Sequence, residues 1–351
     1  MILVGDIHFG VKKFNQSVLE NQISYLKDIV LLAKEKNKQI FQLGDVFDNR
    51  VNCDINFLNS VIEFFQFVKD QGVIFNTLLG NHDIYFRNKL DVNLPSVIQR
   101  IFPDNFKLYT DNTLIDFKDK KILVVPWIVN TSEFPFDLMK KADAVFGHLE
   151  INGFEMTKGH EAEEAKLNKK EFKIPVFTGH FHIKSEKGSI NYIGTPYQLN
   201  WGDFNEIKGV YILNDDLSVD FIENEKSPKH IQLSFDSNNK KPLEIIGFKK
   251  KLSYNLGEFK KNLESLRNHK IKFIINTNDN SYEDFLFVLK EAEIEFEIVN
   301  KFKINEIEVN DVKINNTKDI ILSFLKENHS HYIDEIIGLI GELDENWCEE
   351  C

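Results

Sequence analysis

The sequence contains no long apolar segment and very little cysteine. No apolar run approaches the ~18 residues that a membrane-spanning helix requires, so we expect no membrane association. Met1–Val4 leads directly to Gly5 and Asp6 without a basic stretch, which argues against a signal peptide. Three Cys among 351 residues argue against a disulfide framework and indicate a reducing, cytoplasmic setting.

Positive charge is also scarce. The chain has 43 Lys and Arg against 55 Asp and Glu, which gives a net charge of −12. Nucleic-acid-binding proteins usually carry a basic footprint, so the total charge alone argues against that function. The acidic residues are unevenly spread, however, because the last 21 residues contain seven of them and no Lys or Arg. Bound divalent cations would also reverse the local field, so a polyanionic substrate is not excluded.

Apolar residues make up 42% of the chain, and at its start they follow an alternating pattern of strands and helices. Apolar runs at 2–4, 39–43 and 73–79 are separated by helical periodicity over 17–33 and 55–68. This alternation predicts parallel strands joined by helical crossovers. Further strands are expected at 122–126, 144–146, 176–178, 191–193, 210–213 and 219–222.

The later part of the chain changes character. A polar segment over 225–242 precedes a second, smaller α/β pattern, and helical periodicity returns from Thr317. We therefore predict an α/β protein with three parts. These are a large domain over 1–228, a small α/β domain over 229–305, and a linker with a helical segment over 306–351.

Polar motifs follow five of the predicted strands, each at the point where the strand ends. In open α/β sheets, sites form beyond the carboxyl ends of the strands, so these motifs should converge. Residues two apart on an extended chain project to the same side and can grip one centre. The motifs are Asp6-Ile7-His8, Gly44-Asp45-Val46-Phe47-Asp48, Gly80-Asn81-His82-Asp83, Gly147-His148 and Gly179-His180-Phe181-His182.

These motifs bring together carboxylates, an amide and imidazoles, which are too many ligands for one ion and suit two. Oxygen and imidazole ligands without thiolate favour Mn²⁺, Fe²⁺ or Zn²⁺ over Ca²⁺. Two ions ~3.5–4 Å apart would clamp a phosphoryl group, so we predict two Mn²⁺, with Mg²⁺, Fe²⁺ or Zn²⁺ as possible substitutes.

The ordered set of motifs resembles the calcineurin-like metallophosphoesterase superfamily over about residues 1–225. The resemblance implies a four-layer α-β-β-α core and a leaving-group role for His82, which does not bind metal. It also implies how the ions are held: the first by Asp6, His8 and His182, the second by Asn81, His148 and His180, and both by Asp45. We expect Asp83 to orient His82 or another nearby imidazole.

Within the superfamily, the segments 44–48, 147–154, 192–197 and 201–203 are similar to the SbcD nuclease family. That family includes the meiotic-recombination-eleven nucleases and the recombination endonuclease subunits of tailed phages. Many members carry His where this chain has Asp48, which puts a separate catalytic His there in doubt, so we include Asp48 itself among the expected catalytic residues.

The resemblance to the SbcD family implies a DNA nuclease for recombination and double-strand-break end processing. Its implied activities are 3′–5′ exonuclease on duplex ends and endonuclease on single strands. Its implied partners are an SbcC-type coiled-coil ABC ATPase and a second copy of the chain, in the host cytoplasm if the protein is encoded by a phage. Two alternatives stay open: a small-molecule phosphodiesterase or phosphatase of the same superfamily, and a metal-free scaffold on the same fold.

Two further sets of residues are candidates for binding DNA and the partner. Basic side chains follow the metal motifs or lie in the small domain, where they would contact phosphates; the alternative is that they are ordinary solvated lysines. These are Lys12, Lys13, Arg50, Arg87, Lys89, Lys249, Lys250 and Lys251. The apolar stripe of the last segment, backed by acidic residues, suits docking on a basic helical partner, unless it packs on its own domain. It contains Phe324, Ile333, Ile336, Ile337 and Ile340.

Overall fold

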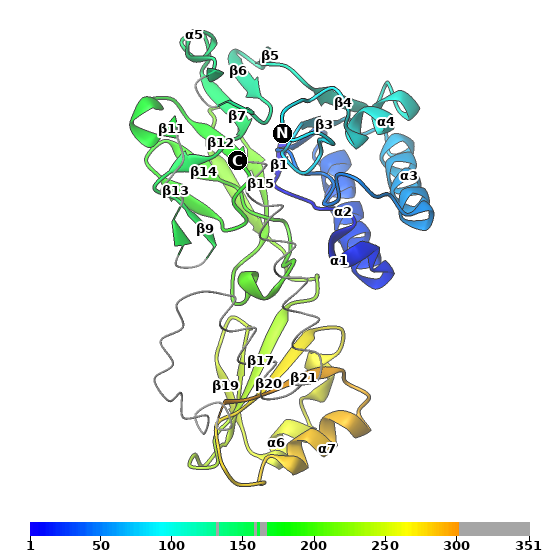
Figure 1. Ribbon diagram of the computed structural model, residues 1–351, viewed down its shortest axis with the longest axis vertical. Helices are drawn as coiled ribbons and strands as arrows, with labels where there is room; N and C mark the ends of the chain where they lie inside the picture. The colour runs from blue at the N-terminus through cyan, green and yellow to red at the C-terminus, as the bar shows by residue number, and fades with distance from the viewer. Residues whose placement is uncertain (131–132, 158–159, 162–166, 302–351) are drawn as a thin grey trace, which may run out of the picture. The chain divides into compact units, whose positions relative to one another are not determined.

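The computed structural model describes residues 1–130, 133–157, 160–161 and 167–301 (Figure 1). The chain divides into two compact units, Met1–Val299 and Asn300–Cys351. The predicted linker and helical segment over 306–351, with its five partner-binding residues, lies outside the described residues. Among the residues that are described, no helix is long and apolar enough to cross a membrane.

The first sheet has six strands and contains the N-terminus. Its order is β16 (Val219–Glu223), β15 (Gly209–Leu213), β1 (Ile2–Val4), β2 (Ile40–Gln42), β3 (Phe75–Leu78) and β4 (Phe106–Tyr109). Strands β1 to β4 run parallel, while β15 pairs antiparallel with both β1 and β16. The helical crossovers predicted from the sequence are therefore confirmed.

Three helices pack against one face of this sheet: α2 (Gln16–Glu35), α3 (Ile55–Asp70) and α4 (Leu94–Ile101). Helix α3 begins where Asp54 accepts a hydrogen bond from the Phe57 amide at 3.0 Å, and Asn15 caps α2 in the same way through Val18. Aromatic rings fill the interface, with Phe65 contacting both Phe75 and Phe106. These helices therefore cover one face of the first sheet.

The second sheet also has six strands. Its order is β13 (Ser185–Lys187), β14 (Ile190–Tyr192), β12 (Val176–Gly179), β7 (Ala144–His148), β6 (Lys120–Val125) and β5 (Thr113–Phe117). Strands β14, β12, β7 and β6 are parallel, and β13 and β5 are antiparallel edges. The central strands are buried along their whole length, as expected for parallel strands that are covered on both faces.

The two sheets pack face to face, which confirms the four-layer α-β-β-α core. Phe41 and Leu78 of the first sheet share one buried cluster with Val124, Phe146 and Phe177 of the second. The outer face of the second sheet is covered by the short helix α5 (Phe136–Met139) and by apolar side chains of the loops around it. The fourth layer is therefore thinner than the first.

Residues 230–300 form a separate five-stranded sheet with its own apolar core. Its order is β19 (Leu252–Tyr254), β18 (Leu243–Ile246), β17 (His230–Phe235), β20 (Lys270–Ile275) and β21 (Phe296–Asn300), with helices α6 (Leu256–Lys260) and α7 (Glu283–Glu291). Helix α6 ends at Lys260, and a short 3-10 helix follows over Leu263–Leu266. The domain boundaries inferred from the sequence stay a prediction.

Candidate metal centre

The five motifs converge where strands of both sheets end. Asp6 and His8 follow β1, Asp45 follows β2, and Asn81, His82 and Asp83 follow β3. His148 is the last residue of β7, and His180 and His182 follow β12. The side chains listed here therefore come from the carboxyl ends of three strands of the first sheet and two of the second.

Three residues of these motifs have left-handed backbone conformations that non-glycine residues rarely adopt. The φ angles are +50° at His8, +55° at Asp45 and +88° at His180. Each such conformation costs roughly 1–3 kcal/mol and persists only where the surrounding structure imposes it. Strain of this kind clusters at functional sites, and here it turns each side chain toward the shared centre.

Two glycines make room for the cluster. Gly44 has φ +89°, and a Cβ at this position would collide with the ring of His148. A Cβ at Gly179 would collide with the carboxylate of Asp6. Both contacts are too close for any side chain, so glycine is required before these polar residues.

Asp6, His8 and His182 form a first group. The Nε2 atoms of His8 and His182 lie 3.0 Å apart, and His182 Nε2 lies 3.9 Å from Asp6 Oδ2. Asp6 is completely buried and accepts hydrogen bonds from the His180 amide. Burial raises the pKa of Asp6 to about 6 and lowers the pKa of His182 to about 4, so the His182 ring is neutral at neutral pH.

Asn81, His148 and His180 form a second group. Asn81 Oδ1 lies 3.0 Å from His148 Nε2 and also 3.0 Å from His180 Nδ1. The Nδ1 of His148 lies 2.8 Å from the Leu43 carbonyl, which fixes the tautomer that leaves Nε2 facing the centre. Burial lowers the pKa of His180 to about 3, so this ring is also neutral.

Asp45 lies between the two groups. Its Oδ2 is 3.3 Å from His148 Nε2 and 3.7 Å from His8 Nε2. Burial opposes ionisation of Asp45, but His148 and the other imidazoles hold its pKa far below the ordinary value. Burial alone would lower the pKa of His148, yet the Asp45 carboxylate raises it to about 9. A charged Asp45 is therefore the electrostatic centre of the cluster.

This donor set fits divalent metal ions. Three groups have all their ligand atoms within 4.8 Å of one another: Asp6 with His8 and His182, Asp6 with Asp45 and His148, and His8 with Asp48 and His82. A shared cation would bind both of the Nε2 atoms of His8 and His182, which face each other in a buried setting. Nitrogen and oxygen ligands without sulfur are typical of Mn²⁺, Fe²⁺ and Zn²⁺.

His82 lies at the edge of this cluster, and its ring contacts the carbonyl of Asp48. Its ring is 4.9 Å from that of His8, and its Nδ1 lies 2.9 Å from the carbonyl of Asp48. The expected role of Asp83 in orienting an imidazole stays a prediction. Asp83 accepts hydrogen bonds from the amides of Asp45, Phe47 and Gly80, because main-chain donors in a buried turn need acceptors.

Asp48 contacts two of the imidazoles at once. Its Oδ1 lies 3.2 Å from His8 Nδ1, while its carbonyl faces His82. Burial alone would lower the pKa of His8, but Asp48 and the other carboxylates raise it. A carboxylate behind the second nitrogen of an imidazole is the usual support of a metal-binding His.

Several residues that support the cluster were not predicted from the sequence. Gln22 of α2 donates to the carbonyl of Ile7 at 3.0 Å, and Lys208 donates to the carbonyl of His182 at 2.6 Å. Trp127 packs against two imidazoles of the second group. Gln22 had a detectable signal, since it is a polar residue on the buried face of an amphipathic helix.

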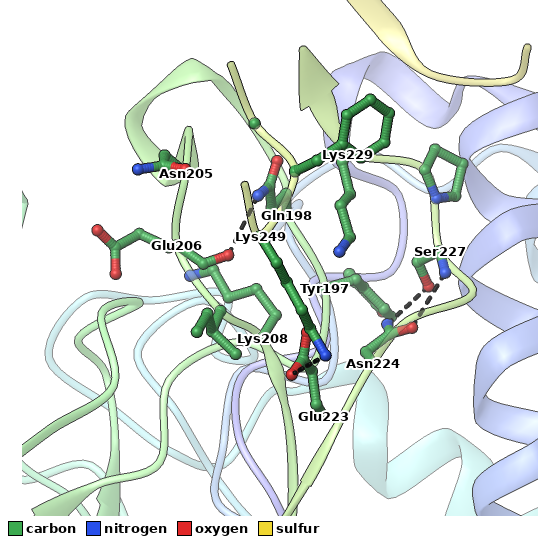
Figure 2. A pocket seen from close by; sticks show the side chains of 14 residues that line it. Tyr197, Gln198, Asn205, Glu206, Lys208, Glu223, Asn224, Ser227, Lys229 and Lys249 are labelled. Carbon is green, nitrogen blue, oxygen red and sulfur yellow. Dashed lines mark hydrogen bonds and ion pairs between the residues drawn. The ribbon is translucent and has the colours of Figure 1, made fainter. Parts of the chain in front are cut away.

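The candidate DNA-contacting residues have different surroundings. Arg50 is half-buried, whereas Arg87 and Lys89 are exposed, and the Lys89 ammonium lies 5.9 Å from the ring centre of Phe86. Lys251 pairs with Glu244 at 2.8 Å. Figure 2 shows Lys249 in a pocket lined by residues of 197–229 and 247–249, where it pairs with Glu223 at 3.1 Å. Ion pairs therefore already engage Lys249 and Lys251, while Lys250 is exposed.

An acidic, imidazole-rich centre at the strand ends of two packed sheets is the arrangement of a metal-dependent phosphoesterase. The family model of calcineurin-like phosphoesterases matches residues 1–184, and the chain belongs to this family. Membership implies a two-ion centre. The chain is also similar to a protein of Enterobacteria phage T4 named Exonuclease subunit 1, with 29% identity over 291 residues. The matched residues make up 80% of this chain and 85% of the phage protein.

Proposed function

We propose that this chain is a two-ion DNA nuclease that cleaves phosphodiester bonds. The observation that carries the proposal is the convergence of six oxygen and nitrogen ligands, which with Asp45 come from five strand ends, around the Asp45 carboxylate. Asp6, His8 and His182 would hold one ion, and Asn81, His148 and His180 the other, with Asp45 shared. The name of the phage relative supports DNA as the substrate.

The residues have distinct roles in this proposal. Two divalent ions would supply charge neutralisation at the phosphoryl group and activation of water. His82 would give a proton from Nε2 to the leaving 3′-oxygen, because its Nδ1 faces the Asp48 carbonyl and Nε2 is the other ring nitrogen. Asp83 would act only by positioning, since it fixes the turns that carry Asp45 and Asn81.

The metal and the direction of cleavage belong to the proposal as well. We favour Mn²⁺ because the site mixes imidazole and oxygen ligands, with Mg²⁺, Fe²⁺ or Zn²⁺ as possible substitutes. We propose 3′–5′ exonuclease action on duplex ends and endonuclease action on single strands. The relative's name, an exonuclease subunit, supports the first of these activities and a partner.

That partner would be an SbcC-type coiled-coil ABC ATPase, bound through the segment over 306–351 in the host cytoplasm.

A homodimer is also proposed, through helices α3 and α4. Apolar side chains on these helices are unusually exposed, with 83% of Ile55 and 43% of Ile101 accessible. Exposed apolar side chains can contribute to an interaction surface, so Ile55→Asp should shift the protein to monomers in light scattering if α3 is part of the interface.

Lys12 and Lys13 are the best supported of the proposed phosphate contacts. The segment α1 (Val11–Phe14) follows His8 and is a left-handed turn, with φ +57° at both lysines and +61° at Phe14. Three such residues in succession are energetically costly, which supports a functional reason for presenting two lysines beside the centre. The ion pairs of Lys249 and Lys251 make these two weaker candidates.

The test of the proposal is hydrolysis of end-labelled linear duplex and single-stranded DNA with Mn²⁺, Mg²⁺ or EDTA. We expect shortening that requires Mn²⁺ and is lost in His82→Ala. Turnover of a small chromogenic phosphodiester with both DNA forms intact would instead favour a small-molecule phosphodiesterase. The matched control is His269→Ala. His269 is also a partly buried imidazole, but it lies within residues 230–300, which form the separate five-stranded sheet.

A further inference from the structure

Trp127 contacts the second group of imidazoles, although nothing in the motifs pointed to it. It follows β6 and is half-buried. The centre of its ring system lies 5.0 Å from that of His180 with the planes tilted by 41°, and 6.0 Å from that of His148 with the planes at 71°. Both distances are typical of direct aromatic packing.

The main chain of Trp127 is bonded to the segment that carries Asn81, the third member of the group. Its amide donates a 2.7 Å hydrogen bond to the carbonyl of Leu79, which lies two residues before Asn81. One residue therefore contacts the segments that provide Asn81, His148 and His180. Asn81 Oδ1 also contacts both imidazoles, but among the aromatic side chains that the structure describes outside the group, Trp127 alone packs on both rings.

His180 depends on packing more than its neighbours do. His148 is fixed by the Leu43 carbonyl at Nδ1, and His8 has Asp48 behind its Nδ1. Among the residues that the structure describes, the ring of His180 has a polar contact at Nδ1 alone, to Asn81. The plane of this ring is otherwise set by Trp127 and by Phe181, whose ring centre is also 5.0 Å away.

We propose that Trp127 is a positioning residue for the second ion, which rests on the proposed two-ion function. The indole would keep the rings of His180 and His148 at the angle that directs their nitrogens to one point. It would also exclude water from one side of both rings, so that the nitrogens do not have to be desolvated when the ion binds. Residues that support metal ligands typically change metal affinity by 10–100-fold when they are replaced.

The test is a Mn²⁺ titration of the purified full-length chain, followed by equilibrium dialysis and electron paramagnetic resonance. Wild type should bind two ions and give the spectrum of a spin-coupled pair. Trp127→Leu should bind the second ion about 10-fold more weakly, with the first unchanged and with the spectrum of a single ion at limiting Mn²⁺. Trp127→Phe keeps an aromatic face and should restore the coupled spectrum.

Trp201→Leu is the matched control. Trp201 is also half-buried and also packs on an imidazole, that of His230 at 4.8 Å, but it contacts no member of the second group. The Trp201→Leu variant should therefore bind both ions like wild type. Thermal unfolding of the metal-free proteins checks that each variant is folded. If the Leu variant is not, Trp127→Met carries the test, because it fills more of the same space without an aromatic face and should weaken the second ion as Leu does.

The outcomes separate the inference from the function on which it rests. If Trp127→Leu binds two ions with wild-type affinity and a coupled spectrum, the positioning role is wrong although the two-ion centre stands. The same holds if only the KM for DNA rises, because Trp127 would then be a substrate contact. If wild type itself binds no Mn²⁺, the proposed function fails.

Discussion

The two halves of the proposed metal centre are supported in different ways. Around Asp6, His8 and His182 the support is polar: Asp48 lies behind His8, and Lys208 binds the carbonyl of His182. Around Asn81, His148 and His180 the support is a main-chain carbonyl and the indole of Trp127. Asp45 lies between the two halves, and Asp6 of the first half also accepts from the His180 amide of the second.

The kind of support determines how each half should respond to substitution. Polar support includes buried charges, and the removal of one partner leaves the other uncompensated, so the first half should lose stability together with metal affinity. Aromatic support leaves no unpaired charge when it is removed, so the second half should lose metal affinity with little loss of stability. The predictions below test this contrast, beginning with the residue that the halves share.

Asp45→Asn should weaken both halves alike, because it removes the carboxylate charge that both halves use. We expect both Mn²⁺ ions to be lost and kcat for DNA cleavage to fall at least ~1,000-fold, which corresponds to about 4 kcal/mol. Equilibrium dialysis and the end-labelled DNA assay measure the two effects. Retention of one tightly bound ion would show that Asp45 serves a single half.

Lys208→Met should destabilise the first half. The Lys208 ammonium donates to His182 O and to Asp203 Oδ1, both at 2.6 Å, and only 5% of Lys208 and 3% of Asp203 are exposed. Loss of the cation leaves a buried carboxylate alone, so the free energy of unfolding should fall by about 3–5 kcal/mol. Denaturant unfolding of the metal-free protein measures this change.

Lys226→Met is the control for that experiment. Lys226 pairs with Asp28 at the same 2.6 Å, but 72% of its side chain is exposed. Solvent screening should limit its effect to less than about 1 kcal/mol. Equal losses in the two variants would mean that burial of the Lys208–Asp203 pair contributes nothing.

A titration of the metal-free protein should detect the pair of His148 and Asp45. The pKa of His148 is raised from 6.5 to about 9, so the folded state binds its proton more tightly than the unfolded state. The resulting stability is fully present below about pH 6.5 and is lost as the pH rises through about 9, by about 3 kcal/mol at most. Unfolding of EDTA-treated protein should show this loss in wild type and not in His148→Gln. Parallel pH curves for the two proteins would contradict the assignment.

The sequence predicted the members of both halves but not what supports them. Strand ends and the glycines before the polar residues are local patterns, so the convergence of Asp6, Asp45 and His148 could be inferred. Support depends on neighbours in space: Trp127 is 21 residues before His148 and 53 before His180 in the chain. The amide contacts of Asp83 were not predicted for the same reason, since nothing local shows which main-chain amides a buried turn leaves without acceptors.

Asp48 and Trp127 together give the sharpest comparison of the halves, because each supports the imidazoles of one half. The side chain of Asp48 contacts His8, whereas its carbonyl contacts His82, which belongs to neither half. Asp48→Ala removes the carboxylate 3.2 Å from His8 Nδ1 but keeps the carbonyl that faces His82. The first Mn²⁺ should bind about 10–100-fold more weakly, with the second unchanged, and Asp48→Asn should lie between Ala and wild type. Trp127→Leu should show the reverse pattern, and the losses should add in the double variant because Asp48 and Trp127 contact none of the same imidazoles. A single variant that weakens both ions equally, or a double variant no worse than either single one, would mean that the centre responds as one unit.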